Sequence, residues 1–276
     1  MNATPKPLVL CADDYAQDAG VSQAVLALAR RGRLSATSAM VLAPRWAEDA
    51  AALGELRGAL DVGLHLDFTS PFALARGHGV SLAAAMRRAA WRGFDVEAAR
   101  LAIEQQLDAF ERAWRAPPDH VDGHQHVQQF AGIRAALVAA LARRYGPRGP
   151  WLRLSRPPPG QGGFKDRVIA AWGAGALQRL ARQHGLPCAP ALSGVYGFDG
   201  DQAAYARRMR RWLAQAPAGT VLMCHPSADT AAATGDAIAA ARWHEFQHLA
   251  SPAFAEQLVS AGVQLARGST LYSAPT

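Results

Sequence analysis

Short apolar runs alternate with helical patterns along almost the whole chain, and this alternation constrains the fold more than any other feature. Each run is only a few residues long, which is typical of strands buried on both faces. The runs span residues 8–12, 35–42, 61–67, 151–155, 189–192, 220–224 and 263–266. The helical patterns span residues 19–31, 46–53, 82–91, 96–114, 132–145, 164–183, 202–214, 243–249 and 252–261. This order predicts an α/β protein with mostly parallel strands and helices outside them.

Two architectures fit such an order: a closed TIM-like barrel and an open, doubly wound sheet. No Gly-x-Gly-x-x-Gly motif follows the first run, which argues against a dinucleotide-binding sheet. The chain has 276 residues, half of them hydrophobic, without an internal repeat or a low-complexity linker. We therefore expect a single domain over residues 1–276.

The formal net charge of +7 raises the question of a nucleic-acid partner. The basic residues are almost all arginines, scattered singly or in pairs along alanine-rich helices, and only Lys6 and Lys165 are lysines. Their clusters are not interleaved with aromatic residues, as a base-stacking surface would require. The charge therefore indicates solvated helix faces rather than a nucleic-acid interface.

The three cysteines, Cys11, Cys188 and Cys224, are widely spaced and form no CxxC pair. This spacing predicts neither a disulfide framework nor a thiolate zinc site, and it is typical of a reducing compartment. The first residues lack the apolar stretch of a signal peptide, and no window approaches the roughly 18 apolar residues of a membrane span. We expect a soluble, cytoplasmic protein without stable membrane insertion.

The stretch 118–128 carries ionisable side chains at every second position, namely His120, Asp122, His124 and His126. On a strand these side chains would share one face. Unpaired buried charge is unfavourable, and neutral imidazole and carboxylate groups are standard ligands for a divalent cation. A solvated loop, or a set of hydrogen-bonded core histidines, is the alternative.

Other polar residues lie in or next to the predicted strands, mostly at their carboxyl ends. They are Asp13, Asp14, His65, Arg153 and His225. In a barrel the carboxyl ends of the strands meet on one face, where α/β enzymes place their chemistry. Histidines with purely structural roles would not be expected to recur at the carboxyl ends of the strands, so the pattern favours one shared metal site.

Four ordered motifs resemble those of the YdjC-like carbohydrate deacetylases. They are Ala12-Asp-Asp-Tyr15, Gly63-Leu-His-Leu66, His120-Val-Asp-Gly-His-Gln-His126 and Met223-Cys-His-Pro226. This family contains the chitooligosaccharide deacetylase and the hopanoid-associated deacetylase. The resemblance implies a distorted (β/α) barrel and a metal-dependent hydrolase that removes acetyl groups from N-acetylated sugars.

Carried over by position, the resemblance implies that Asp14, His65 and His124 are metal ligands. Three such ligands leave coordination positions open for water and for the substrate carbonyl. The family implies one divalent ion, with Zn²⁺ or Mg²⁺ expected first and Mn²⁺ or Co²⁺ as alternatives.

The catalytic residues implied by the resemblance are Asp13, His225 and Arg153. Asp13 would be the general base that deprotonates the water, and His225 the acid that protonates the departing amine. Arg153 would hold Asp13 ionised and oriented.

Asp122, His126 and Tyr15 are implied as supporting or substrate-contacting residues. Tyr15-Ala16 stands where the family commonly has Phe-Gly, and Gln128 stands where it often has another histidine. Both positions are expected to line the sugar pocket. The sequence therefore leaves the identity of the acetylated substrate open among small molecules, oligosaccharides and glycolipids. A homodimer is compatible with the sequence.

Two other classes of function fit the same residues. One is a metal-dependent amidohydrolase or phosphoesterase acting on another small substrate. The other is a non-catalytic sugar- or lipid-binding module in which the ion is structural. Asp13 and His225 argue against the second, because a structural site needs neither a base nor an acid.

Overall fold

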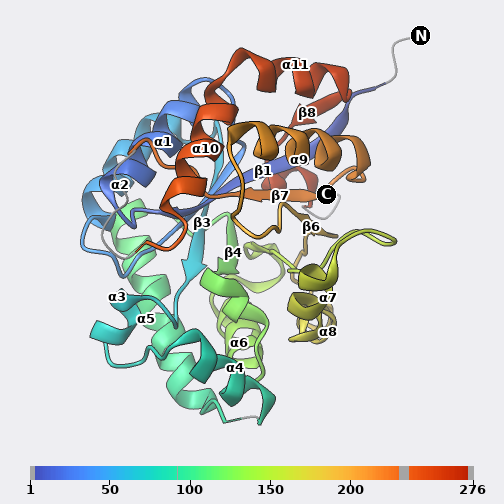
Figure 1. Ribbon diagram of the computed structural model, residues 1–276. Coiled ribbons are helices and arrows are strands. Elements are labelled where there is room, and N and C mark those ends of the chain that lie inside the picture. The colour runs from blue at the N-terminus through green and yellow to red at the C-terminus, as the bar shows by residue number, and fades with distance from the viewer. Residues whose placement is uncertain (1–3, 92, 230–235, 273–276) are drawn as a thin grey trace.

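The strands of the chain form one parallel sheet in the computed structural model, which describes residues 4–91, 93–229 and 236–272 (Figure 1). The strands are β1 (Lys6–Tyr15), β2 (Ala36–Ala39), β3 (Asp61–Leu66), β4 (His120–Gly123), β5 (Trp151–Leu152), β6 (Leu192–Ser193), β7 (Val221–Cys224) and β8 (Val263–Leu265). Their order across the sheet is β5-β4-β3-β2-β1-β7-β6, and β8 pairs with the start of β1. Since the pairs are parallel, the carboxyl ends of the strands lie at one edge.

The sheet curls into a half-barrel, and backbone hydrogen bonds partly bridge the gap between its outer strands. The amide of Leu152 in β5 donates to the carbonyl of Pro187 at 2.9 Å, and the amide of Ala189 donates to the carbonyl of Leu152 at 2.9 Å. Farther along, the amide of Leu192 in β6 donates to the carbonyl of Arg156 at 2.7 Å. The predicted barrel-like α/β fold is confirmed.

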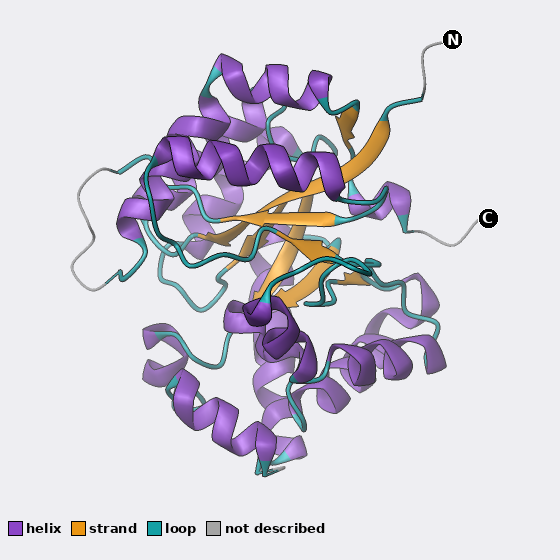
Figure 2. Cartoon of the chain, turned by 45° about the vertical axis from the view of Figure 1, so that its right-hand side comes forward, coloured by secondary structure: helices purple, strands orange, loops and turns teal. Residues whose placement is uncertain are grey.

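Helices surround the strands (Figure 2). The α-helices are α1 (Ala19–Arg30), α2 (Trp46–Leu53), α3 (Pro71–Ala75), α4 (Leu82–Ala90), α5 (Val96–Trp114), α6 (Ile133–Tyr145), α7 (Phe164–Ala171), α8 (Ala174–Gln183), α9 (Gln202–Gln215), α10 (Ala239–Ala250), α11 (Pro252–Ser260) and α12 (Gly268–Leu271). Short 3₁₀ helices are η1 (Gly54–Leu56), η2 (His124–Gln129) and η3 (Gly146–Arg148). Across the described residues, no helix combines the length and apolar character that crossing a membrane requires.

The core explains why the apolar runs became strands and the periodic segments became helices. Every residue of β1 from Leu8 to Tyr15 is buried, as expected for a central strand covered on both faces. In α5 the buried face includes Ile103, Leu107, Phe110 and Trp114, which recur every three or four residues.

Two predicted elements end earlier than expected because their backbone turns. The alternating stretch is a strand only as far as Gly123, and beyond it Gln125 and His126 adopt left-handed φ values of 54° and 63°. The helix expected over 164–183 breaks into α7 and α8 at Gly173, where φ is 135°. A Cβ at Gly173 would lie 2.2 Å from the carbonyl oxygen of Gln129, so only glycine fits this close approach.

Candidate metal centre

The end of β1 carries a bulge that brings two neighbouring carboxylates to one cavity. In a regular strand, adjacent side chains point to opposite faces. The pairing of β1 with β2 shifts register between Ala12 and Tyr15, and Asp14 takes a left-handed φ of 65°. As a result Asp13 and Asp14 both line the same cavity. Bulges and left-handed residues concentrate at functional sites, where they re-aim a side chain.

Asp14 meets His65 from β3 and His124 from the turn after β4. The Oδ1 atom of Asp14 lies 3.4 Å from Nε2 of His65 and 3.0 Å from Nδ1 of His124. One ligand atom from each residue lies within 4.8 Å of the others. One carboxylate and two imidazoles that open on a cavity match a three-ligand catalytic metal site. The donor set therefore fits a divalent ion.

Asp122 fixes how the His65 ring faces this cluster. Nδ1 of His65 lies 2.6 Å from Oδ1 of Asp122, which leaves Nε2 toward Asp14. Burial opposes the charged ring, but Asp122 outweighs it and raises the pKa of His65 to about 10. A bound metal would take the place of the Nε2 proton.

Asp14 is also held by an arginine that the sequence prediction missed. Arg242 in α10 is only 3% exposed, and its Nη2 atom lies 2.7 Å from Oδ2 of Asp14. The Nε atom of Arg242 donates to Asp236 at 2.7 Å. Burial opposes ionisation of Asp14, yet Arg242 and His124 hold its pKa well below the ordinary value. Asp14 is thus a fixed carboxylate with Oδ1 turned to the histidines.

A sequence signal for this arginine existed but was weak. The predicted helix began at residue 243, whereas α10 begins at Ala239 and includes Arg242. Arg242, Glu245 and Leu249 are buried on one face at helical spacing. Two charged residues in register with a buried leucine indicate paired groups rather than a solvated face.

Asp13 forms a two-pronged ion pair with Arg153, beyond the end of β5. Nη1 and Nη2 of Arg153 donate to the two carboxylate oxygens of Asp13, each at 2.7 Å. Nη2 of Arg153 also lies 3.1 Å from Oδ2 of Asp122. Burial opposes ionisation of Asp13, but Arg153 and His65 outweigh it and lower its pKa. Asp13 therefore stays an anion beside the candidate metal ligands.

His225 follows β7 and faces Asp13 from across the cavity. Its Nε2 atom lies 3.8 Å from Oδ2 of Asp13. Burial lowers the pKa of His225 to about 4, so the ring is neutral at pH 7. The backbone amide of His225 donates to Glu245 at 2.6 Å, which anchors the turn that carries the ring. Glu245, like Arg242, was not predicted as a site residue.

Of the three residues expected to contact substrate, only His126 lines the cavity. Its Nδ1 atom lies 2.9 Å from the hydroxyl of Ser155. Tyr15 is fully buried and its hydroxyl donates to the carbonyl of Asp49 at 2.7 Å, so it packs the core instead. Asp122 is also fully buried, behind His65, and so supports that ring rather than touching substrate.

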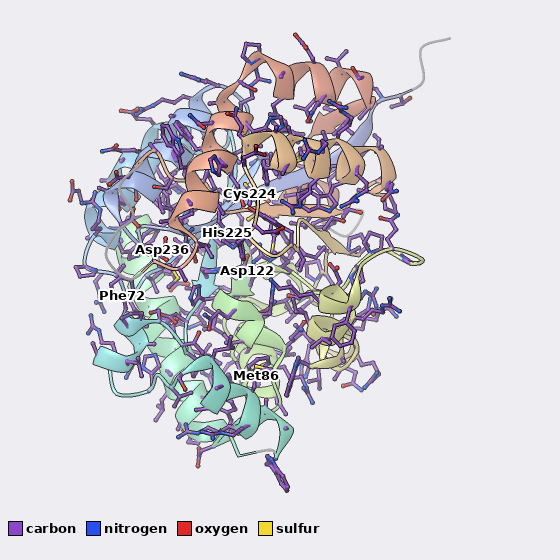
Figure 3. The ribbon with its side chains drawn as sticks, viewed as in Figure 1. Phe72, Met86, Asp122, Cys224, His225 and Asp236 are labelled. Carbon is purple, nitrogen blue, oxygen red and sulfur yellow. The ribbon has the colours of Figure 1, made fainter. Side chains whose placement is uncertain are left out.

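The cavity has a volume of about 750 Å³ and two unlike walls. The wall beside the cluster includes His225 and Asp236, which lie above Phe72 and Met86 in Figure 3, and the wall formed by α3, α4 and α7 is largely apolar but also carries Lys165. The apolar wall is formed mainly by α3, α4 and the α7 region, through Phe72, Leu82, Met86, Val168, Ile169 and Trp172. A ligand filling the space would meet charged groups at one end and hydrocarbon at the other.

Comparison with known proteins gives consistent matches over most of the chain. A family model described as YdjC-like protein matches residues 7–260. A human protein named carbohydrate deacetylase is 30% identical over 299 residues, which cover 94% of this chain and 88% of its own. A Serratia marcescens protein named chitooligosaccharide deacetylase is 29% identical over 230 residues, which cover 80% of this chain and 82% of its own.

A solved structure agrees with the fold. The crystal structure of an Enterococcus faecalis protein with a proposed role in cellobiose-phosphate cleavage superposes with a TM-score of 0.72. The match covers 98% of this chain and 100% of that chain at 18% sequence identity. At this identity the likeness bears on the fold alone.

Proposed function

This chain belongs to the YdjC-like protein family, and we propose that it is a metal-dependent carbohydrate N-deacetylase. The reaction would add water across the amide of an N-acetylated sugar, breaking the C–N bond to give acetate and a free amine. The observation that carries the proposal is the Asp14, His65 and His124 cluster with an arginine-held carboxylate, Asp13, beside it. The names of the curated relatives support the same reaction.

We propose Asp14, His65 and His124 as the residues that hold one divalent ion. The ion would supply Lewis-acid polarisation of the amide carbonyl and an acidified water. Two imidazoles and one carboxylate suit Zn²⁺, while Mg²⁺ would require more oxygen ligands from water. Mn²⁺ and Co²⁺ accept the same donors.

Asp13 is proposed as the general base. Its carboxylate is kept ionised by Arg153 and lies next in the chain to the ligand Asp14. It would accept a proton from the attacking water as the carbon–oxygen bond forms. The paired bonds from Arg153 fix both oxygens, so the base is already oriented when substrate arrives.

His225 is proposed as the acid that serves the leaving amine. Because the pKa of His225 is about 4, the ring is neutral at the start and must receive the proton that it delivers. Asp13, whose Oδ2 lies 3.8 Å from Nε2 of His225, is the proposed source of this proton. The proton taken from water would thus reach the amine nitrogen as the C–N bond breaks.

The cavity supports a substrate with a polar acetamido end and a less polar remainder. The amide would lie at the metal cluster, near His126, and the rest of the molecule along the apolar wall. A small amino sugar, an oligosaccharide stacked on its apolar faces, or a glycolipid would each satisfy this division. A cytoplasmic location and a homodimer stay predictions.

Acetate release is the direct test of this function. Metal-free protein would be loaded with Zn²⁺, Mg²⁺, Mn²⁺ or Co²⁺ and given N-acetylglucosamine, diacetylchitobiose and an alkyl N-acetylglucosaminide. We expect acetate and free amine in equal amounts with at least one metal, and none after chelation. Phosphate release from a phosphoester instead of acetate would favour a phosphoesterase. Sugar binding without turnover under every metal would favour a binding module.

A further inference from the structure

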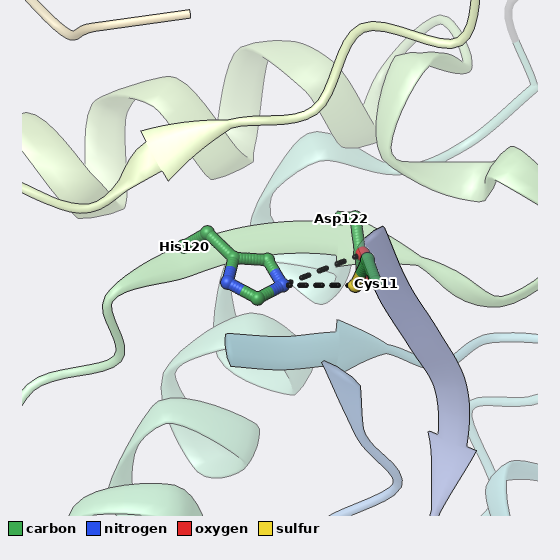
Figure 4. Close-up of side chains that lie close together, drawn as sticks. All are labelled: Cys11, His120 and Asp122. Atoms are coloured by element: carbon green, nitrogen blue, oxygen red, sulfur yellow. Dashed lines mark hydrogen bonds and ion pairs between the residues drawn. The ribbon is translucent and has the colours of Figure 1, made fainter. Parts of the chain in front are cut away.

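A second group of polar side chains lies buried beneath the candidate metal ligands. Cys11 from β1 and His120 and Asp122 from β4 converge there (Figure 4). Ser38 of β2 joins them, and all four residues are fully buried. None of the four lines the cavity. Hydrogen bonding in this layer therefore acts on the cavity only through other residues.

This lower group has metal-binding residue types, but its donors are already committed. Oδ2 of Asp122 lies 3.1 Å from Nη2 of Arg153, whose fixed positive charge disfavours a second cation there. Burial raises the pKa of the Cys11 thiol well above its ordinary value, so the sulfur keeps its proton. The group is a hydrogen-bond network rather than a second metal site.

The direction of the network follows from its donors. The Ser38 hydroxyl donates to Oδ2 of Asp122 at 2.5 Å, so its oxygen has only lone pairs left for the His120 ring. Nε2 of His120, 3.0 Å from that oxygen, must then be the donor. Nδ1 of His120 has no hydrogen-bond partner among the residues that the structure describes, which suits a bare acceptor better than a buried N–H.

The His120 ring is held in place on both faces. It stacks on Trp151 with ring centroids 4.4 Å apart and an interplanar angle of 19°. On β3, a Cβ at Gly63 would lie 2.3 Å from Nε2 of His120, so the ring occupies the space of a missing side chain. Packing thus fixes the position of the Nε2 donor of His120.

We propose that Ser38 and His120 are positioning residues that act through Asp122 on the metal ligand His65. The Ser38 hydrogen bond and the Arg153 ion pair occupy Oδ2 of Asp122 and leave Oδ1 for Nδ1 of His65, while His120 fixes Ser38 by donating to its oxygen. The His65 ring is thereby held with Nε2 toward Asp14. The inference rests on the proposed metal site. Asp122 lies one hydrogen bond behind the proposed ligand His65, a position at which removal of a partner changes metal affinity by about 10- to 100-fold, and Ser38 and His120 lie one and two hydrogen bonds farther back.

The test is the zinc dissociation constant of full-length variants, measured by competition with a chelator. Ser38→Ala removes the hydroxyl, and His120→Phe keeps a ring on Trp151 while removing the donor. Because both residues act through Asp122, we expect each variant to weaken zinc binding by between about 3-fold and about 10-fold, at or below the low end of the range for a direct partner of a ligand. His120→Gln, which can still present an N–H to Ser38, should recover part of the loss.

Ser35→Ala is the matched control, because Ser35 is a buried serine whose hydroxyl accepts from the amide of Leu10 at 3.0 Å, away from this network. It should destabilise the fold without changing zinc affinity.

Zinc binding within twofold of wild type in Ser38→Ala and His120→Phe would overturn the inference. An equal loss in Ser35→Ala would overturn it too, since the effect would then be general. If Ser38→Ala does not fold, the two His120 variants decide. Failure of the wild type to bind zinc would instead remove the proposed metal site itself.

Discussion

Two neighbouring clusters contain similar donor groups but differ in what surrounds them. The upper cluster consists of Asp14, His65 and His124 and opens on the cavity. Its carboxylate faces the two histidines through Oδ1 and pairs with Arg242 through Oδ2. The lower cluster consists of Cys11, Ser38, His120 and Asp122, and none of these side chains lines the cavity. Both oxygens of Asp122 already have hydrogen-bond or ion-pair partners. Residue types alone therefore do not make a metal site. The cluster proposed to hold the metal differs in opening on the cavity.

The largest effect that this comparison predicts is at the upper histidines. His65→Ala and His124→Ala should each abolish tight metal binding and lower acetate release on the order of 10³-fold, a loss of several kcal/mol of transition-state stabilisation. Metal analysis and acetate assays measure both. His184→Ala, at an exposed histidine, is the control and should behave as wild type. Full activity in either upper variant would break the comparison.

The adjacent aspartates should separate binding from catalysis. Asp13→Asn should keep the metal and lose about 10²- to 10⁴-fold in kcat, because the amide cannot act as a base. Asp14→Asn should lose both the activity and the bound metal. The two variants have the same change in size and charge, one residue apart. Metal loss in Asp13→Asn with metal retained in Asp14→Asn would mean that the two roles are exchanged.

Arg242 should stabilise the metal-free protein more than the metal-loaded protein. Arg242→Gln leaves Asp14 and Asp236 without their cation, and breaking such a buried pair destabilises by about 3–5 kcal/mol. Zinc would neutralise Asp14 again, so the free energy of unfolding should fall less when zinc is present. Urea titrations with and without zinc measure the difference. Arg208→Gln, which removes a more exposed ion pair with Asp199, should change stability by about 1 kcal/mol or less. Equal losses with and without zinc would count against Asp14 as a ligand.

The smallest effect is expected at Cys11. Its thiol lies 3.3 Å from Ser38 but outside the path from Ser38 through Asp122 to His65. Cys11→Ser keeps a small polar group, so metal content and acetate release should stay within about twofold of wild type. Loss of bound metal in this variant would show that the lower cluster holds an ion.

The sequence was sufficient to predict the residues that gather at the strand ends, because parallel strands place their carboxyl ends together. Asp14, His65 and His124 follow from this rule together with the family motifs. The rule could not predict the bulge at Asp14, which depends on how β1 pairs with β2. The rule also does not cover Arg242, because that residue lies inside α10 rather than at a strand end, and its weak signal was the helical spacing that it shares with Glu245 and Leu249.

The turn after β4 was missed for a related reason. The alternation of His120, Asp122, His124 and His126 suggested one continuous strand face, but nothing in the pattern marks the left-handed backbone at residues 125 and 126. That turn separates the residues into two groups. His120 and Asp122 stay on the strand in the lower layer, whereas His124 joins the upper cluster and His126 lines the cavity.

Anomalous X-ray diffraction from crystals of the zinc-loaded protein tests the central claim most directly, because it both counts and locates the bound ions. We predict one zinc per chain, ligated by Asp14, His65 and His124, with no peak among Cys11, His120 and Asp122. A peak in the lower cluster, or zinc bound only elsewhere on the chain, would contradict this account.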